Sequence, residues 1–114
     1  MHTAIYQVLQ QVAREAGAIT YAELAPLAEI DLRLPDDRAA LAVILDEINL
    51  HEHNEGRPML SAVVVLAGRQ TLGAGFFACA QRLARVVGAD PQRFWQDELA
   101  AVYRTWPPTI PAKG

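Results

Sequence analysis

The sequence predicts a mostly helical α+β domain, and three observations lead to this fold class. Apolar residues recur at helical spacing in several long segments of the 114-residue chain. One β-branched run, Val63–Val65, stands among them and is followed by a polar turn bracketed by glycines. The composition, 52% hydrophobic and 20% charged, is ordinary for a globular protein, and this length predicts one domain.

Two helices are predicted near the N-terminus. Residues 3–16 carry an apolar stripe, with Thr3 as the expected cap and Gly17 as the expected left-handed residue after the last turn. The tetrapeptide Thr20–Glu23 has the pattern of a capping box, in which each end bonds the backbone of the other. This box predicts a short helix from about Tyr21 to Ala28.

A longer helix and a strand-turn-strand unit come next. The helix is predicted from about Asp37 to Glu52, and the acidic residues at its start suit the helix dipole. The continuous apolar run from Met59 to Leu66 predicts a strand covered on both faces. After a turn at 67–71, residues Gln70–Leu72 are expected to return as a short second strand.

Two C-terminal helices complete the expected order. The first runs from Phe76 to about Val87, and Gly88 is expected to end it. The second begins at Asp90 and Pro91, a cap residue followed by a proline at the first helical position. Trp106 and the two prolines after it stop this helix.

This order is that of a winged helix-turn-helix domain. The helix pair would be Tyr21–Ala28 and Asp37–Glu52, and the small β-hairpin wing would be Met59–Leu72. We predict a single winged-helix-like domain over residues 1–108 and a mobile C-terminal tail over residues 109–114.

Three short motifs carry a resemblance to a known family. The helix start Thr20-Tyr21-Ala22-Glu23-Leu24-Ala25 matches the pattern T-Y-x-x-L-A. Arg38-Ala39-Ala40-Leu41-Ala42-Val43-Ile44-Leu45 resembles the recognition helix R-A-V-G-x-A-L, and Pro58-Met59-Leu60-Ser61-Ala62-Val63-Val64 resembles P-C-H-R-V-V. Residues 19–87 thus resemble the DNA-binding C-terminal domain of alkylguanine-DNA alkyltransferases and their alkyltransferase-like relatives.

The resemblance implies a DNA-associated domain without alkyl transfer. Met59 stands where the reactive cysteine would be, and Leu60 stands where its histidine would be. Leu41 replaces the glycine of the recognition helix. The stretch around residues 58–77 also resembles segments of uncharacterised bacterial proteins, some found alongside restriction-type nucleases. We therefore expect a non-catalytic DNA-repair or restriction-linked accessory module.

Four arginines are the candidate contacts to double-stranded DNA. They are Arg33, Arg38, Arg57 and Arg69. Arginine favours planar contacts to phosphate, and the resemblance gives Arg38 the position of the arginine that replaces a flipped base. The net charge of −3 and the acidic helix after Asp36 disfavour strong phosphate binding. The alternative interpretation is that these arginines pair with the neighbouring carboxylates.

A protein-protein interaction or homodimerisation module is the alternative function. Trp95, Tyr103 and Trp106 are its candidate partner-binding residues, and packing within the chain is the other interpretation of these three. His51 and His53 are two residues apart, which points them away from each other on a helix, so we expect no metal site. Cys79 lies in an apolar helix and is expected to be a buried thiol.

Enzymatic activity is not expected, because no specific catalytic motif or cofactor motif stands in the sequence. No apolar run approaches the roughly 18 residues that a membrane-spanning helix needs. The N-terminus lacks the pattern of a signal peptide, and the single cysteine excludes an internal disulfide. These features predict a cytoplasmic protein that does not bind membranes.

Overall fold

The computed structural model describes residues 1–66 and 74–108. The expected second strand at Gln70–Leu72 and the expected mobile tail at 109–114 therefore lie outside the described residues. The described elements, in chain order, are α1 (Thr3–Arg14), β1 (Ile19–Thr20), α2 (Tyr21–Leu24), the 3-10 helix η1 (Ala25–Ala28), α3 (Pro35–Asn54), the 3-10 helix η2 (Leu60–Val63), β2 (Val64–Val65), α4 (Ala74–Arg82) and α5 (Pro91–Thr105).

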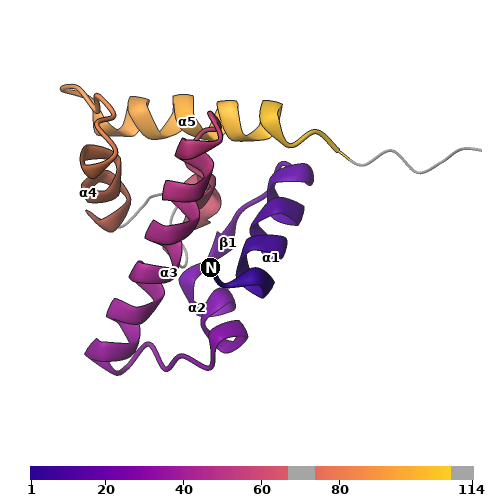
Figure 1. The fold of residues 1–114 in the computed structure, drawn as a ribbon, viewed down its shortest axis with the longest axis vertical. Helices are drawn as coiled ribbons and strands as arrows, with labels where there is room; N and C mark the ends of the chain where they lie inside the picture. The colour runs from indigo at the N-terminus through magenta and orange to yellow at the C-terminus, as the bar shows by residue number, and fades with distance from the viewer. Residues whose placement is uncertain (67–73, 109–114) are drawn as a thin grey trace, which may run out of the picture.

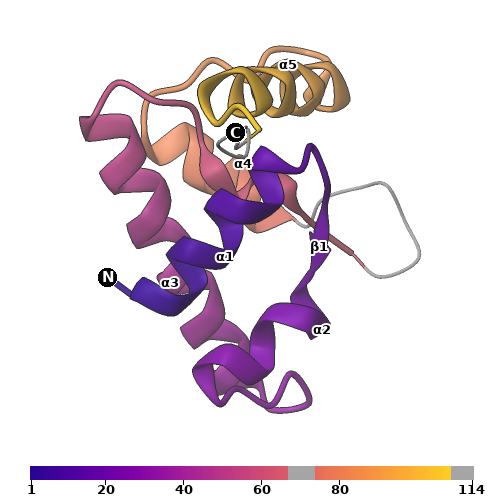
Figure 2. The ribbon, with the colours of Figure 1, turned by 90° about the vertical axis from the view of Figure 1, so that its right-hand side faces the viewer.

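The mostly helical α+β class is confirmed. The long helix α3 runs through the molecule, with α5 across one end of it and α2 near the other end (Figures 1 and 2). The two short strands pair in parallel, with Ile19 opposite Val64 and Thr20 opposite Val65. They are the only paired strands in the part of the chain that the structure describes.

The segment from Met59 to Val65 forms the centre of the core, because all seven of its residues are buried. Helices α1, α3 and α5 all pack against η2, which lies in this segment. The apolar stripes of these helices supply the rest of the core. They include Ile5 and Leu9 from α1, Leu41, Leu45 and Ile48 from α3, and Trp95 and Val102 from α5.

Half of the strand predicted from Met59 to Leu66 is the 3-10 helix Leu60–Val63, and only Val64–Val65 is a strand. At Met59 and Ser61 the backbone N–H groups form hydrogen bonds with side chains instead of with a neighbouring strand. The Ser61 N–H donates to Asn49 Oδ1 at 3.1 Å, and the Met59 N–H donates to Glu98 Oε2 at 2.8 Å. A continuous apolar run indicates that a segment is buried. It does not indicate whether the buried segment is a strand or a short helical turn.

The predicted capping box is present, because Thr20 Oγ1 accepts from the Glu23 N–H and Glu23 accepts from the Thr20 N–H. Other helix ends differ from the predictions. The cap of α1 is His2 in place of Thr3, and its left-handed residue is Ala16 in place of Gly17. Helix α4 ends at Arg82, five residues before the predicted end at Val87. A left-handed Ala84 turns the chain there.

We predict that the indole N–H of Trp95 stabilises η2. It donates to the Ala62 carbonyl at 2.8 Å, whereas the N–H of Trp106 has no hydrogen-bond partner among the described residues. Trp95→Phe leaves a buried carbonyl without this donor, so it should lower the free energy of unfolding by about 1–3 kcal/mol more than Trp106→Phe does. Urea unfolding measures both variants, and equal losses would contradict this role.

Candidate functional site

Arg33 and Arg38 lie close together where α3 begins. The Arg38 Nη1 donates to the carbonyl oxygen of Leu32 at 2.8 Å, so its side chain reaches back to the residue before Arg33. The Arg33 side chain is 89% exposed and pairs with Asp31 at 2.8 Å. The hydrogen bonds from Arg33 lower the pKa of Asp31. Arg38 has no carboxylate partner among the described residues.

Carboxylates outnumber arginines at this end of α3. Within residues 29–38 there are two arginines, but there are four acidic residues, which are Glu29, Asp31, Asp36 and Asp37. Asp37 accepts the backbone N–H of Asp31 at 2.8 Å, which holds the connector against the start of α3. A phosphate approaching Arg38 therefore meets a locally negative surface.

Arg57 lies at the opposite end of α3. The span from Arg38 to Asn54 alone is roughly 24 Å along the helix. Arg57 binds the fully buried Glu52 through two bonds, at 2.8 and 3.1 Å, and these bonds raise the pKa of Arg57. It lies away from Arg33 and Arg38, and its partly exposed guanidinium is bound by Glu52. Arg69 lies outside the described residues.

The three candidate partner-binding aromatics face their own chain. Trp95 is 5% exposed and belongs to the core. Tyr103 donates its hydroxyl to the Gly17 carbonyl at 2.6 Å, and burial raises its pKa. Trp106 lies against the guanidinium groups of Arg14 and Arg57, at 5.2 and 5.4 Å from its ring centre. Trp95 therefore lies in the core, and Tyr103 and Trp106 are partly buried against it.

A row of half-exposed residues on α3 was missed by the sequence analysis. Val43 is 54% exposed and Leu50 is 49% exposed, and Glu47 stands between them. We call Val43, Glu47 and Leu50 the α3 row. The signal that could have found it is apolar residues on more than one face of the helix, since Leu41, Leu45 and Ile48 already supply the buried face.

A groove lies on each side of the α3 row. The first, of about 320 Å³, lies between α3 and α4 and is lined by Val43, Leu50, Cys79 and Leu83, with the ion pair of Asp46 and Arg82 at its edge. The second, of about 310 Å³, is lined by Leu50, His51, Met1, Glu47 and Asn54. Leu50 therefore contributes to both grooves.

A third groove lies beside Arg38. It has a volume of about 320 Å³ and is almost wholly apolar, with Tyr21, Leu32, Leu41, Ala42 and Leu66 as its other lining residues. Two neighbouring leucines of the α2–α3 connection, Leu27 and Leu34, are 41% and 51% exposed. This end of the molecule therefore combines exposed apolar surface with one arginine that lacks a carboxylate partner.

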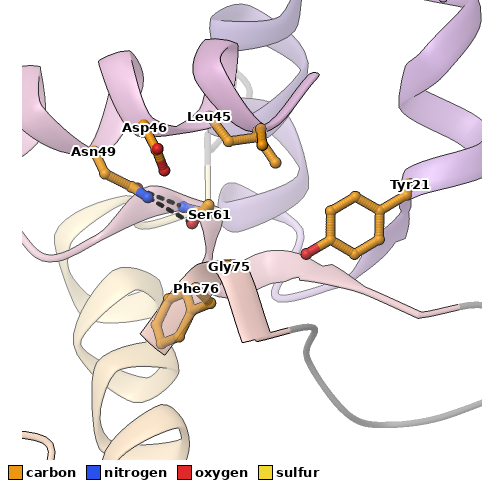
Figure 3. Close-up of a pocket in the computed structure, with 8 residues that line it drawn as sticks. Tyr21, Leu45, Asp46, Asn49, Ser61, Gly75 and Phe76 are labelled. Carbon is orange, nitrogen blue, oxygen red and sulfur yellow. Dashed lines mark hydrogen bonds between the residues drawn. The ribbon is translucent and has the colours of Figure 1, made fainter. Parts of the chain in front are cut away.

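A small cavity of about 40 Å³, lined by both polar and apolar residues, lies between α2, α3 and α4, and it is large enough for a water molecule. In Figure 3 the Asn49 amide meets Ser61, and the Tyr21 hydroxyl points toward Gly75. The Ser61 hydroxyl accepts from Asn49 Nδ2 at 2.7 Å. Ser61, and not the wholly buried Met59, is the residue of this segment that lines the cavity.

Ser61 and Cys79 are the nucleophilic side chains at or near this cavity, and the one carboxylate in its lining, Asp46, is paired with Arg82. No histidine lines it. Cys79 is 3% exposed, it accepts a bond from Asn49 at 3.6 Å, and burial raises its pKa. Among residues 1–66 and 74–108, no three metal-ligating side chains come together. None of the helices in those two ranges is both long and apolar enough to span a bilayer.

Comparison with known proteins adds no relative. No model of a protein family, no curated protein and no solved structure matches this chain.

We predict that Tyr6 makes folding sensitive to alkaline pH. Its hydroxyl donates to Glu52 at 2.8 Å, and burial together with Glu52 raises its pKa. The folded chain therefore keeps this proton at pH values where the unfolded chain loses it. The contribution of the Tyr6 hydroxyl to the free energy of unfolding is complete below about pH 10 and falls as the pH rises beyond that value. Tyr6→Phe should flatten this fall in unfolding measurements, and an unchanged slope would contradict the prediction.

Proposed function

We propose that this chain is a non-catalytic interaction domain that binds another protein through the α3 row. The observation that carries this proposal is the pair of half-exposed side chains Val43 and Leu50, which stand between two grooves. Apolar side chains clustered beside grooves mark interaction sites more often than isolated exposed ones do. We assign no reaction to the domain, because Ser61 and Cys79 are both buried and both accept a hydrogen bond from Asn49.

The rigid setting of α3 supports the proposal. The opposite face of the helix is anchored in the core by Leu41, Leu45 and Ile48, so the α3 row is held in place before any partner arrives. A preformed surface loses little conformational entropy on binding, which favours affinity. Asp46 and Arg82 join α3 to α4 at the edge of the groove and help to fix its width.

We also propose that the domain is a winged helix-turn-helix. The helix pair of α2 with η1 and then α3, joined by residues 29–34, has the order of that fold and supports this assignment. The parallel pair of β1 and β2 joins the start of α2 to the end of η2. The wing itself depends on residues 70–72, which lie outside the described residues.

Site-specific photo-crosslinking in the source cells tests the protein-binding proposal. Benzoylphenylalanine at position 50 should give discrete protein adducts, because this position would face the partner. The same group at position 86 is the matched control, since Val86 is 87% exposed and lines neither groove beside the α3 row. Equal adducts from both positions, or none from position 50, would contradict the proposal.

Association with DNA is a second candidate function. The specific observation in its favour is Arg38, whose guanidinium has no carboxylate partner among the described residues and stands beside the exposed Arg33 at the start of α3. The resemblance to alkyltransferase-like proteins also supports DNA contact at this end of the molecule. We place this function second because DNA binding depends on neutralising phosphates, and acidic residues surround these arginines.

Fluorescence anisotropy of a labelled duplex tests the DNA candidate. If DNA is bound, the affinity should fall steeply between low and moderate salt, and Arg38→Ala should weaken it and lower the salt slope by about one. Arg104→Ala removes an exposed arginine at the end of α5 and is the matched control. Absence of binding at low salt, or equal effects of the two variants, would retire this function.

A further inference from the structure

We infer that the apolar groove beside Arg38 binds a small molecule that has an apolar body and one carboxylate group. This groove lies apart from the α3 row, because its lining shares no residue with the two grooves beside that row. The inference therefore goes beyond the proposed protein-binding function and does not depend on it. Its basis is the composition of the groove, the position of Arg38 and the charges nearby.

The groove has the size and composition of a small-molecule site. Its volume is about 320 Å³, and sites for small ligands range over roughly 300–1,000 Å³. Such sites are mostly apolar and contain a small number of polar groups that orient the ligand. Here Leu32, Leu41, Ala42 and Leu66 supply apolar wall, so the body of the ligand should be apolar.

Arg38 is the one charged side chain among the described residues that line the groove. Its Nη1 donates to the carbonyl oxygen of Leu32 at 2.8 Å, and Leu32 itself lines the groove. This bond holds the guanidinium at the groove wall and uses one of its five N–H donors. Within residues 1–66 and 74–108 the Arg38 charge has no carboxylate partner. A ligand carboxylate would supply that partner, because a planar guanidinium binds it through two parallel hydrogen bonds.

The acidic residues near the start of α3 favour a ligand with a single negative charge. Asp31 pairs with Arg33, and Asp37 accepts the Asp31 N–H, so these two carboxylates have partners other than Arg38. No acidic residue is among the described lining of the groove. Repulsion from the nearby carboxylates increases with the charge of the ligand. A phosphomonoester carries roughly −1.5 to −2 charges at neutral pH, so a carboxylate with its single charge is repelled less.

Isothermal titration calorimetry with decanoate tests the inference. Decanoate combines an apolar chain with one carboxylate, and decyltrimethylammonium has the same chain with a positive group in place of the carboxylate. The full-length protein should bind decanoate, and it should bind decyltrimethylammonium at least about tenfold more weakly. Arg38→Gln should weaken decanoate binding about fivefold or more, because it removes a charge-assisted hydrogen bond.

Arg33→Gln is the matched control for charge. It removes a neighbouring positive charge that pairs with Asp31 and does not line the groove. The affinity for decanoate should therefore change less than about twofold, as expected for an exposed ion pair. Equal losses in the Arg33 and Arg38 variants would show general attraction of an anion to this end of the molecule, and would overturn the inference.

A second pair of variants tests the groove itself. Ala42 lines the groove, so Ala42→Leu should occupy part of it and weaken decanoate binding about fivefold or more. Ala39→Leu adds the same side chain at an exposed position of α3 that lines neither this groove nor those beside the α3 row. Leucine is a good helix former, and thermal unfolding checks that both variants are folded. Equal affinities of the two variants for decanoate would overturn the inference.

Other occupants of the groove would give different results. Absence of decanoate binding, or equal affinity for decyltrimethylammonium, would overturn the carboxylate site. A concentration-dependent dimer in sedimentation that Ala42→Leu abolishes would identify a second copy of the chain as the occupant. Protein adducts from benzoylphenylalanine at position 42, without decanoate binding, would identify another protein, and either result would overturn the inference. The α3 row is tested separately, because Leu50 does not line this groove.

Discussion

The structure depends on one constraint, which is that the segment from Met59 to Val65 is buried although only its last two residues, Val64 and Val65, pair with another strand. Buried backbone groups need hydrogen-bond partners. Here side chains supply several of them, because Asn49 of α3 accepts the Ser61 N–H, Glu98 of α5 accepts the Met59 N–H and Trp95 donates to the Ala62 carbonyl. These bonds tie α3 and α5 to the centre and fix the helices that carry the surface.

Two buried carboxylates fix the positions of two arginines. Glu52 binds Arg57 and Glu98 binds Arg85, at 2.8 and 3.0 Å, because a buried carboxylate is stable only when it is paired. These arginines neutralise the two buried carboxylates while their own side chains stay partly exposed. The outer surface of α3 presents Glu47, which pairs with the N-terminal ammonium, between Val43 and Leu50.

The helix ends show where sequence rules succeed and where they fail. The capping box at Thr20 was predictable because its two bonds join residues three apart. Four helical segments end with a left-handed residue and the same pair of backbone bonds, but only one of these residues is a glycine, Gly56. At Ala16, Glu29 and Ala84 the surrounding structure sustains a left-handed conformation that costs about 1–2 kcal/mol. No local pattern marks such positions.

The sequence alone determined the mostly helical class, the order of the helices and the apolar faces that build the core, because periodicity and caps are local properties of the chain. It did not determine the form of the Met59–Val65 segment or the hydrogen bond between Tyr6 and Glu52. It also did not determine the burial of Trp95 or the exposure of Leu50. Each of these was decided by contacts between residues distant in the sequence: Asn49 with Ser61, Tyr6 with Glu52, and Trp95 with Ala62. The candidate site is a tertiary feature because a helix with apolar residues on several faces becomes a binding surface only on the face that the fold leaves uncovered.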